Sequence, residues 1–212
     1  MSIVIIDYGL SNLTSVFHTL KTIYNDVIIS SNKKDLISAK ILILPGVGTF
    51  NDGMKNIIKL DLFDTIRTCV LDKSIPIIGI CLGMQLFATY GYEGGKTNGL
   101  NLIEGEVIKL ISYNKIDKIP HVGWNEIIYD NDNDNVFHNI PNNTDFYFVH
   151  SYIFNAKNIN DILSTTKYSN YSDSIISSIH KNNIYGFQFH PEKSQKAGNI
   201  LLKNIIYKYI NI

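Results

Sequence analysis

Cys81 is the residue whose type and setting most clearly favour nucleophilic chemistry. It lies at the centre of a Gly-x-Cys-x-Gly motif between Gly79 and Gly83, directly after the apolar segment 75–80. A strand that turns sharply into a helix at such a motif exposes the central side chain as a nucleophile. The two glycines fit this interpretation because neighbouring backbone in so tight a turn leaves no room for a Cβ atom. From the motif alone, a small buried cysteine packed beside two glycines is an equally good interpretation.

The segments around this motif favour the nucleophile. Residues 84–90 are expected to form a helix, and its positive N-terminal end would stabilise the thiolate form of Cys81. The N–H group of Leu82, the next residue, can donate a hydrogen bond to an oxyanion. A second glycine corner, at 45–48, follows another apolar segment and can offer a further N–H group to the same oxyanion. On its own this corner could also be a simple turn or a phosphate cradle, although it lacks the Lys-Ser/Thr ending of a P-loop.

His190 is the strongest candidate, among six histidines, for the base that activates such a thiol. It ends a predicted strand in which aromatic residues alternate with Gln188, and Glu192 follows close enough to orient its ring. A positioned imidazole can take the proton of the thiol and later protonate the leaving amine. The histidines that lack a comparable setting are His18, His138 and His180. The second cysteine, Cys69, has no glycine punctuation around it and is predicted to lie in the core.

The first half of the chain alternates two kinds of segment. Short apolar segments predicted as strands are separated by segments whose apolar residues recur at helical spacing. The predicted strands are 3–6, 27–29, 41–44 and 75–80, and the predicted helices are 12–23 and 57–71. A helix between two strands makes them parallel, and parallel strands bury both faces. We therefore expect an α/β fold with a central, mostly parallel sheet flanked by helices.

The second half has a different character. Gly, Asn, Tyr and Asp are frequent there, and the predicted strands 105–110 and 125–129 resemble antiparallel hairpin strands. The polar run 130–135 is expected to be a surface loop, because its side chains compete for backbone hydrogen bonds. Residues 197–210 return to helical spacing. With no internal repeat and no Pro-rich linker, residues 1–212 are predicted to form one domain with a mixed sheet.

The bulk composition argues against several classes of protein. The chain has 19 Lys and Arg against 19 Asp and Glu, so no net charge attracts it to nucleic acid or to an anionic membrane. No apolar run approaches the ~20 residues that a membrane span needs. Two cysteines without metal-site spacing favour a reducing, cytoplasmic compartment and predict neither a metal nor another cofactor.

Six segments spread over nearly the whole chain resemble the class I, triad-type glutamine amidotransferases, a family with a flavodoxin-like fold. Two of them are typical of the glutaminase subunits of imidazole glycerol phosphate synthases. These two are Pro120-His-Val-Gly-Trp-Asn125 and Tyr147-Phe-Val-His-Ser-Tyr152. The other four are Asp7-Tyr-Gly9, Pro45-Gly-Val-Gly48, Gly79-Ile-Cys-Leu-Gly-Met-Gln85 and Gly186-Phe-Gln-Phe-His-Pro-Glu-Lys-Ser194.

The resemblance implies a role for ten residues. It implies Cys81 as nucleophile, His190 as base and Glu192 as the residue that orients the base. The residues that it places against the glutamine substrate are Gln85, Glu93, Ser151 and Tyr152. The residues that it places at the oxyanion are Gly48 and Leu82 as donors, with Val47 on a strand that reorients on activation.

The resemblance also implies a partner. Members of this family work as heterodimers in which a (βα)8-barrel cyclase receives the ammonia released from glutamine, in histidine biosynthesis. The segments around Trp124 and Tyr152 would suit such an interface, although packing in the core is the favoured interpretation for Trp124 taken alone. Other possibilities are a similar glutaminase that serves a synthase amidinating a surface-glycan sugar, a free-standing cysteine hydrolase, and a scaffold without activity.

Overall fold

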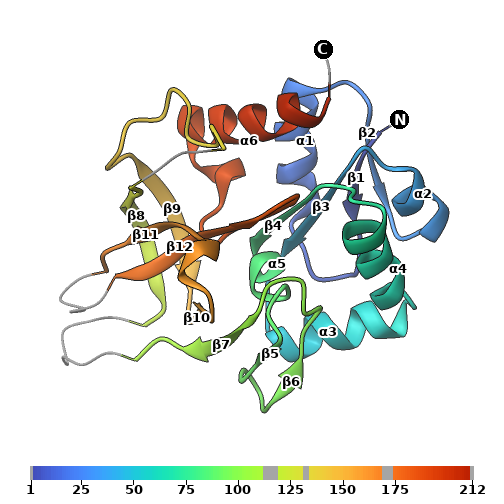
Figure 1. Ribbon diagram of the computed structural model, residues 1–212, viewed down its shortest axis with the longest axis horizontal. Coiled ribbons are helices and arrows are strands. Elements are labelled where there is room, and N and C mark those ends of the chain that lie inside the picture. Colours follow the sequence, from blue (N-terminus) through green and yellow to red (C-terminus); the bar gives the residue numbers. More distant parts are fainter. Residues whose placement is uncertain (1, 112–118, 131–133, 169–173, 211–212) are drawn as a thin grey trace.

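A nine-stranded mixed sheet forms the centre of the computed structural model, which describes residues 2–111, 119–130, 134–168 and 174–210 (Figure 1). Within these residues the strand order is β2-β1-β3-β4-β13-β12-β11-β8-β9. The first five strands in this order pair in parallel. They are β2 (Val27–Ser30), β1 (Ile3–Ile6), β3 (Ile41–Gly46), β4 (Ile77–Cys81) and β13 (Ile184–Phe187).

The other half of this sheet is antiparallel throughout. Its strands are β12 (Ile175–Lys181), β11 (Ile162–Thr166), β8 (His121–Ile128) and β9 (Asp145–His150). A smaller sheet of four strands lies beside it. Its strands, in order, are β10 (Tyr152–Ala156), β7 (Gly105–Lys109), β5 (Tyr90–Gly91) and β6 (Thr97–Asn98). The predicted α/β fold, mostly parallel in the first half with an antiparallel portion in the second, is confirmed.

Helices cover both faces of the parallel half, as Figure 1 shows. Successive strand residues point to opposite faces, so Ile3 and Ile5 pack with α1 (Leu13–Ile23) and α6 (Gln195–Tyr209). Val4 and Ile6 face the other cluster, to which the remaining helices contribute. These helices are α2 (Lys33–Ser38), α3 (Phe50–Lys59), α4 (Phe63–Arg67) and α5 (Leu82–Gln85). Each helix therefore packs against one face of the sheet. The candidate nucleophile, Cys81, lies at the carboxyl end of the parallel strand β4.

The predicted helix 57–71 is wrong as a single element. The chain turns at Asp61, which has a positive φ of 56°, so α3 ends at Lys59 and α4 begins at Phe63. Helix α3 starts earlier than predicted because the Thr49 hydroxyl accepts a hydrogen bond from the Asp52 N–H at 3.2 Å. A Thr three residues before an acidic residue is an N-terminal capping signal, and it precedes the periodic apolar positions on which the prediction rested.

The predicted helix 84–90 is also wrong in its extent. Helix α5 begins at Leu82 and has only one turn, and Tyr90 already belongs to β5. The carbonyl groups of Leu86 and Phe87 accept hydrogen bonds from residues 100 and 102 and so do not continue the helix. The other predicted helices are confirmed with small shifts of their ends: 12–23 corresponds to α1 and 197–210 to α6. Among the described residues, no helix is both long and apolar enough to cross a membrane.

Candidate active site

Cys81 occupies a strained turn between β4 and α5. Its φ of 54° and ψ of −111° lie outside the regions that residues with a side chain normally adopt. A Cβ atom added to Gly83 would lie 1.7 Å from the Leu44 carbonyl oxygen on β3, so only glycine fits there. One on Gly79 would lie 2.6 Å from the Phe87 ring. The predicted crowding around the glycines is therefore confirmed, and it holds the cysteine at the carboxyl end of the parallel strands.

His190 and Glu192 form a buried pair. The chain leaves β13, reaches His190, and a single 3₁₀ turn (Pro191–Lys193) brings Glu192 back beneath the ring. Nδ1 of His190 lies 2.8 Å from Oε1 of Glu192, and both side chains are at most 3% exposed. The His190 N–H donates to the Tyr147 carbonyl, which fixes the backbone of this turn against β9.

The electrostatic setting favours a protonated His190. Burial alone would lower the pKa of its imidazole, but the neighbouring Cys81 and Glu192 outweigh this and raise the pKa to about 9. Nε2 of His190 is buried and has no hydrogen-bond partner among the described residues. The Cys81 thiol donates instead to the Val149 carbonyl at 3.7 Å. No hydrogen bond joins Nε2 to the thiol in this conformation, but the imidazole lies close enough to Cys81 for that residue to raise its pKa.

The predicted glutamine contacts converge on a pocket in front of Cys81. The pocket has a volume of about 180 Å³, and Cys81 and His190 both line it. All four predicted contact residues line it as well, namely Gln85, Glu93, Ser151 and Tyr152. They come from α5, from the loop after β5 and from the start of β10, elements that the fold alone brings together.

Glu93 is the one acidic side chain of this pocket among the described residues. Burial raises the pKa of its carboxyl group, while a hydrogen bond from the Phe50 N–H, 2.9 Å from Oε2, lowers it in part. A half-buried carboxylate in a small pocket is suited to binding an ammonium group.

The three predicted oxyanion residues lie at the same pocket, but one of their N–H groups is occupied. Val47, Gly48 and Leu82 all line the cavity. The Val47 N–H donates to the Leu10 carbonyl at 2.9 Å. Gly48 has a positive φ of 99°. In this conformation the amide of Val47 is not available to an oxyanion.

The sequence profile of one protein family matches almost the whole chain. The family is described as glutamine amidotransferase class-I, and its profile matches residues 4–208. The chain belongs to this family. The resemblance inferred from the sequence motifs is thereby confirmed.

Within the class-I glutamine amidotransferases, the chain is similar over nearly its whole length to subunits of imidazole glycerol phosphate synthase. The chain is 44% identical over 207 residues to the imidazole glycerol phosphate synthase subunit HisH 1 of Parasynechococcus marenigrum, covering 96% of each chain. It is 44% identical over 202 residues to HisH 1 of Campylobacter jejuni, covering 95% of this chain and 98% of that one. It is 40% identical over 205 residues to HisH of Aquifex aeolicus, covering 96% and 95%.

Solved structures support the amidotransferase fold. PurLQS from Thermotoga maritima superposes with a TM-score of 0.73 at 18% identity, covering 98% of this chain and 98% of that one. A glutamine amidotransferase from Thermotoga maritima superposes with a TM-score of 0.68 at 16% identity, covering 100% and 99%. At these identities the likeness concerns the fold alone.

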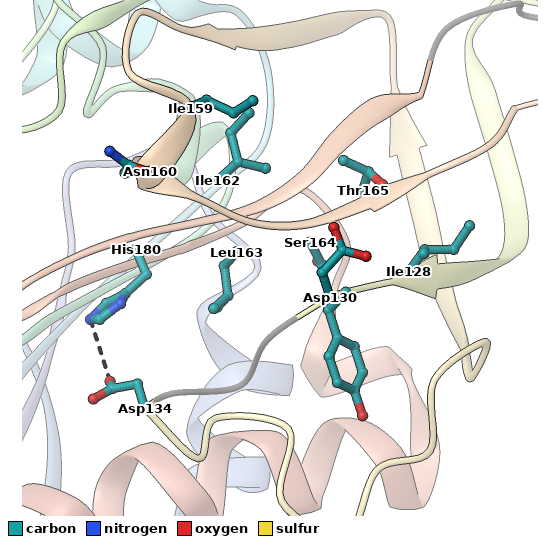
Figure 2. Close-up of a pocket in the computed structure, with 11 residues that line it drawn as sticks. Ile128, Asp130, Asp134, Ile159, Asn160, Ile162, Leu163, Ser164, Thr165 and His180 are labelled. Atoms are coloured by element: carbon teal, nitrogen blue, oxygen red, sulfur yellow. Dashed lines mark ion pairs between the residues drawn. The ribbon is translucent and has the colours of Figure 1, made fainter.

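This amidotransferase has a larger cavity than the pocket at Cys81, on the antiparallel half of the sheet (Figure 2). Its volume is about 670 Å³, and none of the ten predicted site residues lines it. Residues of β8, β11 and β12 line it, including Thr165 and His180. Despite its size, this cavity is therefore not the site that the sequence motifs predict.

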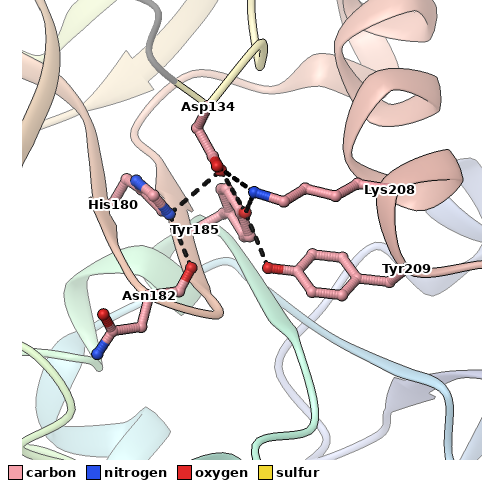
Figure 3. A network of polar contacts seen from close by, with 6 residues as sticks. All are labelled: Asp134, His180, Asn182, Tyr185, Lys208 and Tyr209. Atoms are coloured by element: carbon pink, nitrogen blue, oxygen red, sulfur yellow. Dashed lines mark hydrogen bonds and ion pairs between the residues drawn. The ribbon is translucent and has the colours of Figure 1, made fainter.

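The rim of this larger cavity is held by a polar network around Asp134 (Figure 3). The Asp134 carboxylate accepts a hydrogen bond from the Tyr185 hydroxyl at 2.5 Å and pairs with Lys208 of α6. His180 lies 3.3 Å from the same carboxylate. The polar run 130–135 was predicted to be a surface loop, and this is confirmed where the structure describes it: Asp130 and Asn135 are exposed, and Asp134 lies in a turn with its side chain 22% exposed. Residues 131–133 lie outside the described part of the chain.

Three buried polar residues at or next to the pocket in front of Cys81 were not predicted as site residues: His121, Gln188 and His150, the last of which lines the pocket. His121 Nδ1 lies 2.9 Å from His150 Nε2 across the β8–β9 pair. His150 Nδ1 lies 2.9 Å from the Tyr152 carbonyl. A period-two pattern on β8 and β9, with a histidine on the inner face of each, would have been the signal in the sequence.

No group of three or more His, Cys, Asp or Glu side chains suited to a metal ion occurs in the part of the chain that the structure describes. Cys69 is buried in the core, as predicted. Trp124 is 47% exposed, so the interpretation of this residue as core packing is wrong. Its strand β8 lies between β11 and β9, but β11 pairs only with Ile127 and Ile128, so at Trp124 the strand pairs with β9 alone.

Proposed function

We propose that this chain is the glutaminase subunit of an imidazole glycerol phosphate synthase. It hydrolyses glutamine to glutamate and ammonia and passes the ammonia to its partner subunit for histidine biosynthesis. The observation that carries the proposal is that the strained Cys81 turn and His190 line one small pocket, with Glu192 paired to His190 behind it. The names of the relatives, subunits of imidazole glycerol phosphate synthase, support the pathway.

In the first chemical step the Cys81 sulfur attacks the side-chain amide carbon of glutamine. The tetrahedral intermediate collapses as the C–N bond breaks, and His190 Nε2 donates the proton that the leaving amine requires. A raised pKa of about 9 keeps this proton on the imidazole at neutral pH. Water then hydrolyses the thioester, with His190 as base, and glutamate leaves. Glu192 keeps the ring in the orientation that both steps need.

The oxyanion of the intermediate requires donors that this conformation supplies only in part. Leu82 and Gly48 line the pocket, whereas the Val47 N–H is bonded to the Leu10 carbonyl. We infer that the Val47 peptide leaves Leu10 before the enzyme reaches full activity. Losing one oxyanion donor typically costs an enzyme about 10²–10³ in kcat, so this step would limit hydrolysis in the resting state.

The pocket residues divide the recognition of glutamine between them. The Glu93 carboxylate suits the α-ammonium group, since both are partly removed from water in the occupied pocket. Ser151 and Tyr152, at the start of β10, flank the same cavity and offer backbone and hydroxyl groups to the α-carboxylate and the amide. Gln85 lies on the floor beside Cys81 and is 4% exposed.

The partner is inferred to be a (βα)8-barrel cyclase. Ammonia released into neutral water is mostly protonated and loses its nucleophilicity, so a closed interface with the acceptor enzyme preserves it. An apolar face suited to such an interface includes Val122 and Trp124 on β8, which are 52% and 47% exposed. The Tyr147 ring lies 5.9 Å from the Trp124 ring and extends this face toward His190.

The whole chain, residues 1–212, is proposed to act as one glutamine amidotransferase domain, which the family match over residues 4–208 supports. A reducing compartment such as the cytoplasm suits this function because the proposed nucleophile is a free thiol.

The experiment that tests the proposal measures glutamate release from glutamine by the chain alone, with the histidine-pathway cyclase, and with the cyclase and its nucleotide ligand. We expect strong stimulation by the cyclase and its ligand. Glutamate release without any stimulation would retain the glutaminase and reject the proposed partner. No glutamate release under any condition would reject the proposed activity.

A further inference from the structure

Gln188 lies behind the floor of the pocket, between the strand β13 and His190. Its side chain is fully buried and does not line the pocket itself. Burying a primary amide is unfavourable unless its donors and acceptor are satisfied. The partners of its amide group therefore indicate which residues Gln188 positions.

Both ends of the Gln188 amide contact residues of the proposed glutaminase site. Nε2 donates toward Cys81 Sγ at 3.8 Å, and Oε1 accepts a hydrogen bond from Gln85 Nε2 at 2.9 Å. Gln85 Nε2 also donates to the Tyr152 carbonyl at 2.9 Å. One amide group therefore links the nucleophile to the wall of the pocket.

The backbone of Gln188 makes this amide a rigid support. Its N–H donates to the Ser177 carbonyl at 2.9 Å, which fixes it against β12. Its neighbours Phe187 and Phe189 are fully buried on the opposite face, in the cluster with α1 and α6. These contacts fix the backbone of Gln188, and the hydrogen bonds to Cys81 and Gln85 then orient its side chain.

A donor fixed beside a sulfur atom acts most strongly when the sulfur is charged. A neutral thiol is a weak acceptor, whereas a hydrogen bond to an ionised acceptor is roughly twice as strong as a neutral one. The Gln188 amide therefore favours the thiolate over the thiol. Its other end holds Gln85 in the geometry that the pocket requires.

We propose that Gln188 is a positioning residue of the glutaminase reaction, which stabilises the Cys81 thiolate through Nε2 and holds Gln85 through Oε1. It does not touch the substrate. The inference rests on the proposed function, and it assigns to the segment before His190 a task separate from that of the triad.

Two variants separate the two contacts. Gln188→Met has similar length and removes both hydrogen bonds. Gln188→Glu, in its ionised form, keeps an acceptor for Gln85 but replaces the donor at the sulfur with an acceptor and a negative charge. The matched control is Thr166→Val on β11, an equally buried side chain whose hydroxyl donates to the Glu126 carbonyl, away from the pocket.

The first readout is the rate at which iodoacetamide alkylates Cys81 at neutral pH, followed by mass spectrometry of the Cys81 peptide. This small reagent reports the reactivity of the sulfur without requiring glutamine to bind. We expect both Gln188 variants to react about 10- to 100-fold more slowly than the unmodified chain, and Thr166→Val to react at the unmodified rate. Equal rates in all four proteins, each shown to be folded by circular dichroism, would overturn the proposal.

The second readout is kcat and KM for glutamine in the presence of the cyclase. Gln188→Glu is expected to lower kcat with little change in KM, because Gln85 is still held, while Gln188→Met is expected to change both. A change of KM alone in both variants would contradict the role at the sulfur. If the unmodified chain releases no glutamate, the proposed function fails, and the alkylation rates still decide whether Gln188 activates Cys81.

Discussion

At the scale of single residues, the account depends on the protonation state of His190. Its pKa, raised to about 9, means that the imidazolium form dominates at neutral pH and is lost as the pH rises through that value. The kcat for glutamine hydrolysis is therefore expected to fall above about pH 9.

The Glu192→Gln variant tests the cause of this raised pKa. Removing the carboxylate takes away one of the two groups that raise the pKa of His190, so the alkaline limb of the pH profile should move to lower pH. Turnover should fall less than in His190→Ala, which loses the proton donor itself. Equal and complete losses in the two variants, with no shift of the limb in Glu192→Gln, would contradict this division of roles.

Tyr8 offers a second test at this scale, one of stability. Its side chain is fully buried, and its hydroxyl has no hydrogen-bond partner among the described residues. An unsatisfied buried hydroxyl costs ~1–3 kcal/mol, so Tyr8→Phe is expected to leave the free energy of unfolding unchanged or to raise it by about 1 kcal/mol. Urea denaturation measures this quantity. A loss above about 1 kcal/mol would mean that the hydroxyl has a partner in solution.

At the scale of elements, His121 of β8 and His150 of β9 belong to a chain of polar contacts that has one hydrogen atom too few when both imidazoles are neutral. The contacts run from the Tyr152 carbonyl through His150, His121 and Asn125 to the Lys167 carbonyl. Each contact needs one hydrogen atom between its heavy atoms. Each neutral imidazole carries one N–H, and the Asn125 amide directs one N–H to the Lys167 carbonyl, which makes three hydrogen atoms for the four contacts. Only a protonated pair would satisfy all of them.

Burial opposes that extra proton. It lowers the pKa of His121, and together with the neighbouring His121 it lowers the pKa of His150 to about 3. The buried His150 stays neutral in the folded protein, but it has a pKa of 6.5 in the unfolded chain. Its neutral form therefore stabilises the folded protein fully above about pH 6.5. This contribution is lost as the pH falls from 6.5 toward about 3.

The His121→Phe variant tests this linkage. It keeps the ring stacking on Phe148 but removes one titrating group. We expect it to destabilise the protein by ~1–3 kcal/mol at about pH 7, through the lost hydrogen bonds. The gap to the unmodified protein should narrow below about pH 6.5, by at most about 1.4 kcal/mol per pH unit. Free energies of unfolding measured at several pH values decide the matter. If this difference in the free energy of unfolding stays constant or widens as the pH falls, the two histidines are not neutral in the folded protein.

The elements also show what the sequence could predict. The Cys81 turn and the His190–Glu192 pair are local, because a few consecutive residues fix their geometry, and motifs therefore predicted them. The contacts of Gln188 and His150 join residues that are far apart in the sequence, so a local pattern can place each residue on a strand face but cannot pair it with its partner. The helix predicted over 57–71 failed because the spacing of apolar residues continues through a turn that only the positive φ of Asp61 reveals.

At the scale of the whole molecule, the exposed face around Trp124 is where the proposed partner is expected to dock. An exposed aromatic side chain at the centre of an interface often contributes more than about 1 kcal/mol to binding. Trp124→Ala should therefore weaken binding of the cyclase about 10-fold or more and reduce its stimulation of glutamate release. The iodoacetamide reactivity of Cys81 in the isolated chain should not change.

The matched control for this variant is Tyr207→Ala. Tyr207 is 41% exposed, as Trp124 is 47% exposed, but it lies on α6 and not on β8. Helix α6 packs against α1. Calorimetric titration with the cyclase compares the two variants. Equal affinities for Trp124→Ala and Tyr207→Ala would exclude the β8 face as the principal docking surface.

The most direct test of the account is the rate of glutamate release by the unmodified chain and by Cys81→Ala, each saturated with the cyclase and its nucleotide ligand. Cys81→Ala removes only the sulfur from a turn that the surrounding glycines hold, so folding and partner binding should remain. The account predicts that Cys81→Ala binds the cyclase with unchanged affinity and releases no glutamate above the uncatalysed rate. Glutamate release by Cys81→Ala at a rate near that of the unmodified chain would contradict the proposed mechanism.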